Sequence, residues 1–406
     1  MTSESAGTQA NLGDLSDYSL QLNRWYLKPI GAWPSHSSTS RQERIVSIIL
    51  IVLCYCSISF TVIPCMLHVI LEHEDIRKTV RVLGPLTHWI VGGINYTTLL
   101  LRSKEIQYCV KHIETDWRII TRAKDQYVML KNAQYGRYVA AFCGTFMQGG
   151  VLSYCLVTAL TTQIIQVGNE TRTVHVLPCV FYKKLLDVDT SPINEIVIAS
   201  QFLSSFIVNS SAVAAFSLAA VFAAHAGGQL NVLVTMVTEY GNESGKYSKG
   251  VQFNEIGEIV EHHLRVLSFI SRIEDVMNRI SFMEMFKCSL NICLIGYYIL
   301  TEWSDHNVQY QTTYFVLLIS MTFNIFIVCY IGEALTEQCK EIGEVVYMTN
   351  WYHLPYKNAL DLIMIIARSS VVTKITAGKL IHMSVYTFGD IIKTSFAYLN
   401  ILRRTM

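Results

Sequence analysis

Charged residues are scarce in this sequence, and neither sign prevails. Only 16% of the 406 residues are Asp, Glu, Lys or Arg, whereas about a quarter of a typical soluble protein is charged. The 32 basic residues nearly balance the 31 acidic ones, so the chain has no overall field that would attract nucleic acid. Hydrophobic residues make up 51% of the chain, which excludes a disordered protein and predicts one unit embedded in a membrane.

A secretory signal is also missing at the start of the sequence. Residues 1–44 are mixed and polar, contain Pro29 and Pro34, and lack the short apolar core that such a signal requires. We therefore expect these residues to form a cytoplasmic segment, with the first membrane span acting as its own insertion signal.

Seven runs with few or no charges reach the length of a membrane span. A helix needs roughly 20 apolar residues to cross the hydrocarbon core, and backbone groups in lipid must bond internally, which favours helices. The predicted spans are residues 45–71, 82–101, 138–168, 196–224, 282–301, 307–332 and 380–402. The predicted fold class is therefore an all-α membrane protein with seven transmembrane helices.

The fifth predicted span contains two charges. Residues 288–301 are uncharged but too short to cross alone, and residues 282–287 supply the missing length. We expect Glu284 and Lys287 to extend their charged ends to the membrane interface, as long side chains near helix ends do.

Basic residues give the expected orientation, because Lys and Arg accumulate on the cytoplasmic side of a membrane. With the N-terminus inside, 22 basic residues precede the first span or lie within residues 102–131, 246–287 and 340–379, and eight lie on the opposite side. We therefore expect a cytoplasmic N-terminus and an extracellular C-terminus.

The eleven cysteines do not define a disulfide framework. On this topology only Cys179 lies clearly in an outer loop, and we interpret the cysteines inside spans as small buried hydrophobes. Of four Asn-x-Ser/Thr sequons, only that of Asn169 falls in an outer loop. Asn169 is therefore the candidate glycosylation site, with an unmodified loop residue as the alternative.

No metal site, cofactor site or catalytic centre is expected. His262 and His263 adjoin two glutamates in a charged cytoplasmic stretch, and a solvated helix face explains this cluster better than a metal site. An enzyme would need convergent His or carboxylate groups within the spans, and the sequence offers none.

The seventh predicted span has one polar face. Its members recur at steps of three and four residues: Thr387, Asp390, Lys393, Thr394, Ala397, Tyr398, Asn400 and Ile401. Either Asp390 and Lys393 neutralise each other against neighbouring helices, or the face is lined by water, since intramembrane charges favour cavities and pathways. One helix cannot enclose a pore, so conduction along this face would require several copies around a symmetry axis.

A second cluster is aromatic and mostly uncharged. It lies in the outer halves of four predicted spans and contains His88, Trp89, Met147, Gly150, Tyr154, Phe202, Phe206, Tyr314 and Leu317. Helix packing is one interpretation of this pattern. The other is an apolar cavity with a few polar groups, which would bind a small volatile organic molecule.

The last ninety residues contain a distinctive set of motifs. They are CYIGEALTEQCKEIGEVVYMTNWYHLP from Cys329, LIMIIARSS from Leu362, TAGKL from Thr376 and TSFAYLNILRR from Thr394. In these motifs and in span number and orientation, the chain resembles the insect odorant receptors.

The resemblance implies a ligand-gated, non-selective cation channel in the plasma membrane of sensory dendrites. The resemblance further implies a heterotetramer, in which an odorant-binding subunit assembles with a shared co-receptor. It also implies that the seventh helix is split into a cytoplasmic anchor and a pore-lining half. By this resemblance residues 45–335 carry spans one to six, residues 336–376 the anchor region and residues 377–406 the pore. The implied pore residues are Asp390, Thr394, Tyr398, Ile401 and Leu402, with Tyr398 at the gate.

Departures from related families favour an odorant-specific tuning subunit. The segment between the fourth and fifth spans lacks the long insertion of the co-receptor, and gustatory receptors would show a terminal Gln-Phe where this chain has Asn400-Ile401-Leu402. A gustatory-type receptor and a non-conducting receptor or transporter remain the alternatives. A G-protein-coupled receptor is disfavoured, since its motifs are missing and its topology is the reverse.

Overall fold

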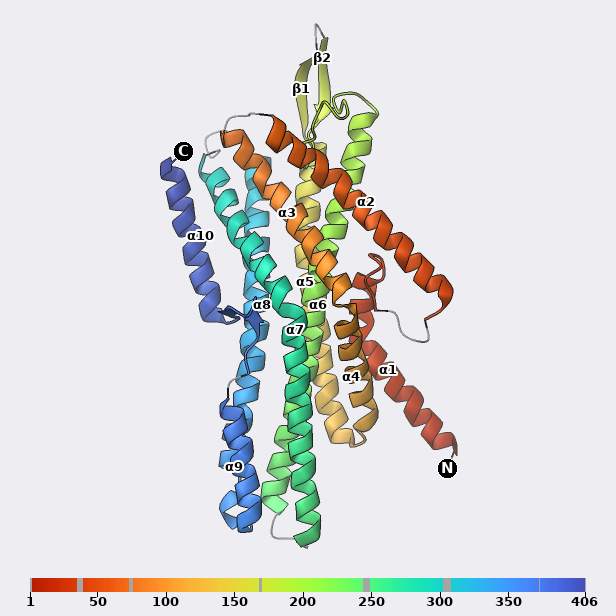
Figure 1. Ribbon diagram of the computed structural model, residues 1–406, viewed down its shortest axis with the longest axis vertical. Helices are drawn as coiled ribbons and strands as arrows, with labels where there is room; N and C mark the ends of the chain where they lie inside the picture. Colours follow the sequence, from red (N-terminus) through yellow and green to blue (C-terminus); the bar gives the residue numbers. More distant parts are fainter. Residues whose placement is uncertain are drawn as a thin grey trace.

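The chain folds into a bundle of long helices with two small hairpins (Figure 1). The computed structural model describes residues 2–34, 39–72, 76–167, 170–243, 249–301, 308–371 and 373–405. The helices are α1 (Thr2–Leu27), α2 (Arg41–Leu71), α3 (Ile76–Leu101), α4 (Ser103–Ile119), α5 (Ala123–Leu160), α6 (Ile193–Glu243), α7 (Lys249–Thr301), α8 (Val308–Met348), α9 (Tyr356–Ser370) and α10 (Val385–Thr405). The antiparallel hairpins are β1 (Thr162–Val167) with β2 (Glu170–His175), and β3 (Thr376–Ala377) with β4 (Ile381–His382).

Helix α6 forms the centre of the bundle. It packs against α1, α2, α3, α5, α7 and α8, and 89% of its most apolar stretch is buried. Small residues such as Ser211, Ala215 and Ala219 recur along it at four-residue steps. Without a hydrophobic drive between helices in lipid, small side chains promote packing by allowing close backbone approach.

Five helices among the described residues are long and apolar enough to cross a membrane: α2, α5, α6, α7 and α8. This supports the predicted multi-pass helical fold. Helix α3 and helix α10 cover the other two predicted spans, but neither reaches this standard of length and composition. Polar residues or glycines interrupt the apolar residues of both helices, so their polar groups need partners on neighbouring helices.

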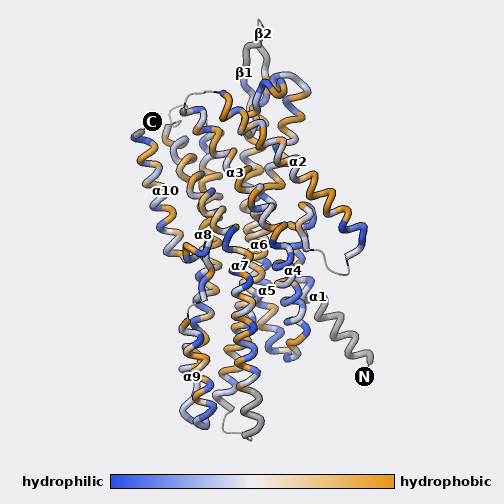
Figure 2. The backbone as a smooth tube through the Cα atoms, viewed as in Figure 1, coloured by the Kyte–Doolittle hydropathy of each residue, from blue (hydrophilic) through white to orange (hydrophobic). Residues whose placement is uncertain are grey.

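The apolar residues concentrate along one half of the long axis (Figure 2). Helices α2, α3 and α10 accompany the bundle only in this half, which ends in the β1–β2 hairpin. Beyond it, α5, α6, α7 and α8 continue with alternating polar and apolar residues, joined by α4 and α9. The helices are therefore longer than the predicted spans, and the basic segments around α4 and α9 lie at the end opposite the hairpin.

Two predicted spans end or begin differently in the structure. The run 138–168 was expected to be one helix, but α5 ends at Leu160 and the chain turns into the β1–β2 hairpin. The β-branched run after it, including Thr162, Ile164 and Ile165, favours a strand once the helix leaves the bundle. Similarly, residues 380–384 precede α10 instead of forming its first turn.

The segment before the first predicted span packs against the bundle, although its composition predicts a polar tail. In α1, Leu20, Asn23 and Leu27 are fully buried against the bundle. The Tyr96 hydroxyl on α3 also donates a 2.7 Å hydrogen bond to the Ile30 carbonyl, which fixes the turn that follows α1.

The β3–β4 hairpin separates α9 from α10. Gly378 and Lys379 adopt positive φ angles of 63° and 59°, the left-handed conformation that a tight hairpin turn requires. A Cβ on Gly378 would lie only 3.0 Å from the Phe282 ring, so glycine is needed for space as well. The hairpin is held on α7 by a 2.8 Å hydrogen bond from the Gly378 amide to the Asn278 carbonyl, which sets where α10 begins.

Candidate functional site

A cavity of about 490 Å³ lies between α3, α5, α7, α8 and the segment that follows β2. This volume falls within the usual range for small-molecule sites, which are mostly apolar with a few placed polar groups. Trp89, Val151, Leu294 and Leu317 supply apolar wall, one from each of the four helices. The geometry therefore suits a compact, largely apolar organic molecule.

Most polar groups at the cavity wall are already engaged. The Trp89 indole Nε1 donates a 3.0 Å hydrogen bond to Ser204 Oγ, and the Tyr154 hydroxyl donates one of 3.0 Å to the Pro178 carbonyl. Asn291 Nδ2 donates to Thr87 Oγ1 at 3.2 Å and to the Lys287 carbonyl at 2.9 Å. These bonds fix the shape of the wall.

His88 is different. Its side chain lines the cavity and the residue is 8% exposed, yet neither ring nitrogen has a hydrogen-bond partner among the described residues. A buried polar group without a partner costs about 1–3 kcal/mol. The imidazole is therefore free to bond a polar group of a molecule in the cavity.

Five of the nine residues in the aromatic cluster predicted from the sequence line this cavity: His88, Trp89, Tyr154, Tyr314 and Leu317. The other four lie elsewhere. Met147 is buried, with its carbonyl accepting a 3.1 Å bond from Asn209, and Gly150 packs closely on Ser320. Phe202 is half-buried and Phe206 is 40% exposed, and neither borders the cavity.

Sequence reasoning missed two parts of the wall. The first is α7, which contributes Asn291, Leu294 and Tyr298, and the second is residues 176–180 after β2. The spacing of three and then four residues on α7 marks one helical face and is visible in the sequence. No periodic pattern distinguishes residues 176–180, because an irregular segment has none.

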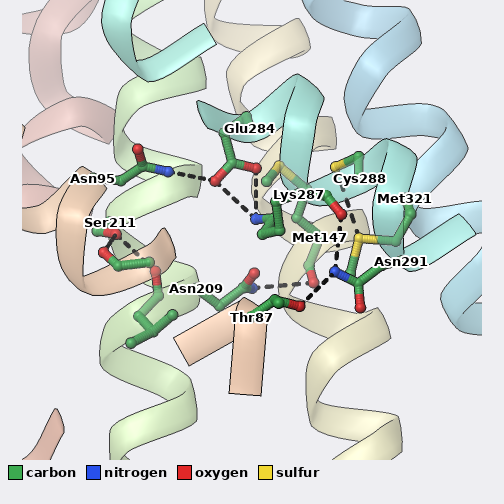
Figure 3. Close-up of polar contacts among 12 residues, drawn as sticks. Thr87, Asn95, Met147, Asn209, Ser211, Glu284, Lys287, Cys288, Asn291 and Met321 are labelled. Carbon is green, nitrogen blue, oxygen red and sulfur yellow. Dashed lines mark hydrogen bonds and ion pairs between the residues drawn. The ribbon is translucent and has the colours of Figure 1, made fainter. Parts of the chain in front are cut away.

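A buried ion pair lies in α7, one helical turn before the cavity residue Asn291 (Figure 3). Lys287 Nζ is 2.6 Å from Glu284 Oε2, and both side chains are at most 3% exposed. Asn95 Nδ2 on α3 donates a 2.5 Å hydrogen bond to Glu284 Oε1. The expectation that these charges extend to the membrane interface is therefore wrong, because a partner three residues away and an amide from α3 satisfy them inside the bundle.

Helix α10 has one face on the bundle and one face open. Ser395 and Leu399 are buried, and Leu402 packs against the same cluster as Leu399. The opposite face is accessible and carries two hydroxyls: Thr394 is exposed, and Tyr398 and the apolar Ile401 are 58% and 60% exposed. Three of the five expected pore residues, Thr394, Tyr398 and Ile401, are therefore exposed, while Asp390 and Leu402 are partly buried.

The recognised C-terminal motifs hold α10 at its start. A carboxylate oxygen of Glu333 on α8 accepts a 2.8 Å hydrogen bond from the Val385 amide in the first turn of α10. A Cβ on the neighbouring Gly332 would lie 2.7 Å from Met383 Cβ. The backbones of α8 and of the segment before α10 are therefore too close for any residue other than glycine at position 332. This gives the Gly332-Glu333 pair a structural reason.

The expectation that His262 and His263 lie on a solvated helix face is wrong. His263 is 3% exposed, and His262 is half-buried with Nε2 3.0 Å from the Gln229 carbonyl, while Glu258 and Glu261 point outward. Across the described ranges, no three His, Cys, Asp or Glu side chains are grouped as metal ligands. The sequon at Asn169 lies outside the described residues.

The long apolar helices define a multi-pass membrane protein whose bundle contains a cavity of small-molecule size. The family model described as 7tm Odorant receptor matches residues 75–396, which is most of the chain. The protein therefore belongs to the insect odorant receptor family.

Individual relatives match part of the chain. Odorant receptor 2a of Drosophila melanogaster is 24% identical over 185 residues, covering 44% of this chain and 47% of that protein. Odorant receptor 13a of the same species is 24% identical over 197 residues, covering 45% and 46%. The chain thus spans about half the length of the curated relatives it matches.

Solved structures share the whole fold. The insect olfactory receptor OR5 from Machilis hrabei, solved in complex with eugenol, superposes with a TM-score of 0.77 at 14% sequence identity, over 96% of this chain and 100% of that one. A second structure of that receptor gives a TM-score of 0.75 at 15% identity. At such low identity the likeness establishes the fold alone.

Proposed function

We propose that this chain is the odorant-binding subunit of a ligand-gated, non-selective cation channel. The observation that carries the proposal is the cavity of about 490 Å³ with largely apolar walls, lined also by the His88 imidazole, for which the described part of the chain supplies no hydrogen-bond partner. Burial against these walls provides affinity, and a hydrogen bond to His88 provides orientation. The eugenol bound by the Machilis hrabei receptor supports a small organic ligand here too.

The proposed topology has the N-terminus in the cytoplasm and the C-terminus outside, with seven crossings. Clustering of the basic segments around α4 and α9 at one end of the molecule supports it, because Lys and Arg accumulate on the cytoplasmic side. The β1–β2 hairpin and the end of α10 then lie outside the cell. We place the protein in the plasma membrane of sensory dendrites on the basis of its family.

The proposed ion pathway runs along the open face of α10. Asp390, Thr394 and Tyr398 present a carboxylate and two hydroxyls on a helix whose opposite side packs against α7 and α8. A single copy leaves this face without a partner in lipid, whereas several copies around an axis would enclose water. Leu402 packs on the bundle, so we assign it a supporting role and keep Tyr398 as the gate residue.

Helix α7 connects the cavity to α10. Asn291 and Leu294 line the cavity, while Ser289 Oγ lies 3.0 Å from Ser395 Oγ on α10. A Cβ on Gly296 would lie 2.9 Å from Leu399, so the two helices touch closely there. A ligand that favours one position of α7 would therefore bias α10, provided that it binds the open state more tightly.

The proposed partner is a co-receptor subunit, with contacts through the anchor region. At the cytoplasmic end, Tyr347, Met348, Tyr356 and Met364 are 62% to 80% exposed. A cluster of exposed large apolar side chains is typical of a protein interface. The short connection between α6 and α7 supports a tuning subunit, because the co-receptor has a long insertion there.

Whole-cell current in cells that express this chain with the co-receptor tests the proposal. We expect an odorant panel to evoke current that persists when G-protein signalling is blocked. His88→Leu, Trp89→Ala and Tyr314→Ala should each shift the half-maximal concentration for an active odorant by about tenfold or more, the effect of losing ~1.4 kcal/mol of binding. Phe206→Ala is the matched control and should leave it unchanged.

Two outcomes would contradict the proposal. Absence of any odour-evoked current, with normal surface expression, would favour a non-conducting receptor or transporter. A response unaffected by all three cavity variants would remove the cavity as the binding site.

A further inference from the structure

Two cysteine thiols meet at the outer end of the cavity. Cys65 on α2 and Cys179 in the segment after β2 are 114 positions apart, yet their Sγ atoms are 2.8 Å apart. Both residues are buried, at 0% and 2% exposure. A disulfide has an S–S distance of about 2.05 Å, so closing the bond needs a shift of less than about 1 Å.

The position of Cys179 is fixed by other contacts, which makes the encounter specific. Gln201 on α6 holds its backbone from both sides: Oε1 accepts a 3.0 Å bond from the Cys179 amide, and Nε2 donates a 2.8 Å bond to its carbonyl. The Tyr154 hydroxyl on α5 bonds the preceding carbonyl, and the Phe181 ring lies 5.7 Å from that of Phe60 on α2. These contacts hold Cys179 next to α2 without involving its sulfur atom.

We propose that Cys65 and Cys179 form a disulfide that fastens the outer wall of the cavity to α2. The proposal rests on the proposed topology, which places both thiols on the side of the membrane that matures in an oxidising compartment, where disulfides persist. Two S–H bonds break and one S–S bond forms. The two electrons and two protons pass to an oxidised dithiol carrier of the secretory pathway, through a mixed disulfide.

The timing of the reaction follows from the surroundings of the pair. The hydrogen bond with Cys65 and burial together raise the pKa of the Cys179 thiol well above its usual range. Exchange requires a thiolate, so the folded pair reacts slowly, and we expect the bond to form while the chain folds.

The bond would act on ligand binding through residues 177–180. Leu177, Pro178, Cys179 and Val180 line the cavity, and α2 is the least buried of the five apolar helices, at 17% of its most apolar stretch. A covalent link to α2 keeps this irregular segment in its binding conformation. Such preorganisation raises affinity by reducing the ordering cost of binding.

Mass spectrometry of the purified full-length chain with its co-receptor tests the bond directly. Free thiols are alkylated under denaturing, non-reducing conditions before digestion. We expect a linked peptide pair containing Cys65 and Cys179 that disappears after reduction, with Cys155 fully alkylated. Cys155 is a matched control, because it is also buried beside this segment but bonds Ser205 Oγ. Full alkylation of Cys65 and Cys179 without reductant would overturn the proposal.

Odour-evoked current tests the role of the bond. Relative to wild type at equal surface expression, Cys65→Ser and Cys179→Ser should each raise the half-maximal odorant concentration by about tenfold, with no further change in the double variant. Cys155→Ser should leave it unchanged. If the disulfide is present but its removal leaves the half-maximal odorant concentration unchanged, the proposed role of the bond in holding the cavity wall is wrong. The mass measurement does not depend on conduction, so failure of the disulfide and failure of the channel proposal are distinguishable.

Discussion

Helices α7 and α10 are neighbours, and each carries an acidic and a basic residue three positions apart. On α7, Lys287 Nζ lies 2.6 Å from Glu284 and both side chains are at most 3% exposed. On α10, Lys393 Nζ lies 3.7 Å from Asp390, and the two side chains are 79% and 48% exposed. The same sequence pattern thus gives a buried ion pair on one helix and an open one on the other.

The difference comes from what faces each pair. Asn95 on α3 donates a hydrogen bond to Glu284 inside the bundle, while α10 packs mainly against α7 and α8 and lies at the edge of the molecule. A buried pair contributes specificity more than stability. An open pair within the apolar half of a membrane protein indicates water or another subunit beside it. The contrast between the two ion pairs therefore distinguishes α7, which is packed inside the bundle, from α10, the candidate pore helix.

Removing one partner of the buried pair should have the largest effect. Lys287→Met leaves the Glu284 carboxylate buried and uncompensated, and breaking such a pair costs about 3–5 kcal/mol. We expect surface expression to fall to near background, measured by labelling an extracellular tag. The double variant Glu284→Gln/Lys287→Met removes both charges and should recover much of the expression. An equal loss of surface expression in the single and double variants would show that the uncompensated charge of Glu284 is not its cause.

A bulky residue at the contact between the two helices should have an intermediate effect. Gly296→Leu pushes against Leu399, because even a Cβ would lie 2.9 Å from that side chain, and overpacking typically costs about 1–3 kcal/mol. We expect an altered basal current or odorant sensitivity in whole-cell recordings, with partial rescue by Gly296→Leu/Leu399→Ala. Unchanged currents in the single variant would argue against coupling through this contact.

Neutralising the open pair should have little effect on folding. Exposed ion pairs contribute about 0–1 kcal/mol, so Asp390→Asn and Lys393→Met should reach the surface at nearly wild-type levels. Lys393→Met is the direct counterpart of Lys287→Met. We expect Asp390→Asn to lower the preference for cations over anions, measured as a shift of reversal potential in a salt gradient. A loss of expression like that of Lys287→Met would remove the contrast between the two helices.

The sequence predicts the helical fold well and the site only in part. Long uncharged runs identify the apolar helices, and three- and four-residue steps identify the open face of α10. The burial of Glu284 and Lys287 was not predictable, because their partner Asn95 lies 189 positions away and no local pattern relates the two. The β1–β2 hairpin was missed because the uncharged run continues from α5 through β1, so no charge marks the end of the helix at Leu160.

The cavity shows the same division. His88 and Trp89 were found because they belong to a cluster of aromatic residues in the outer halves of the predicted spans. Asn291 and Tyr298 were missed, although their spacing marks one face of α7, because the predicted cluster includes no residue of the fifth span. The wall at Cys179 depends on hydrogen bonds from Gln201 and Tyr154, which are tertiary contacts that only the folded chain brings together.

Accessibility of α10 during conduction is the most direct test of the central claim that its open face lines the ion pathway. Thr394→Cys and Tyr398→Cys are compared with Ser395→Cys and Leu399→Cys on the buried face, each beside wild type to account for native thiols. A charged, membrane-impermeant thiol reagent applied with odorant should reduce current through the first two variants and leave the other two unchanged. Unchanged current in Thr394→Cys and Tyr398→Cys, or equal modification of both faces, would contradict a pore along this helix.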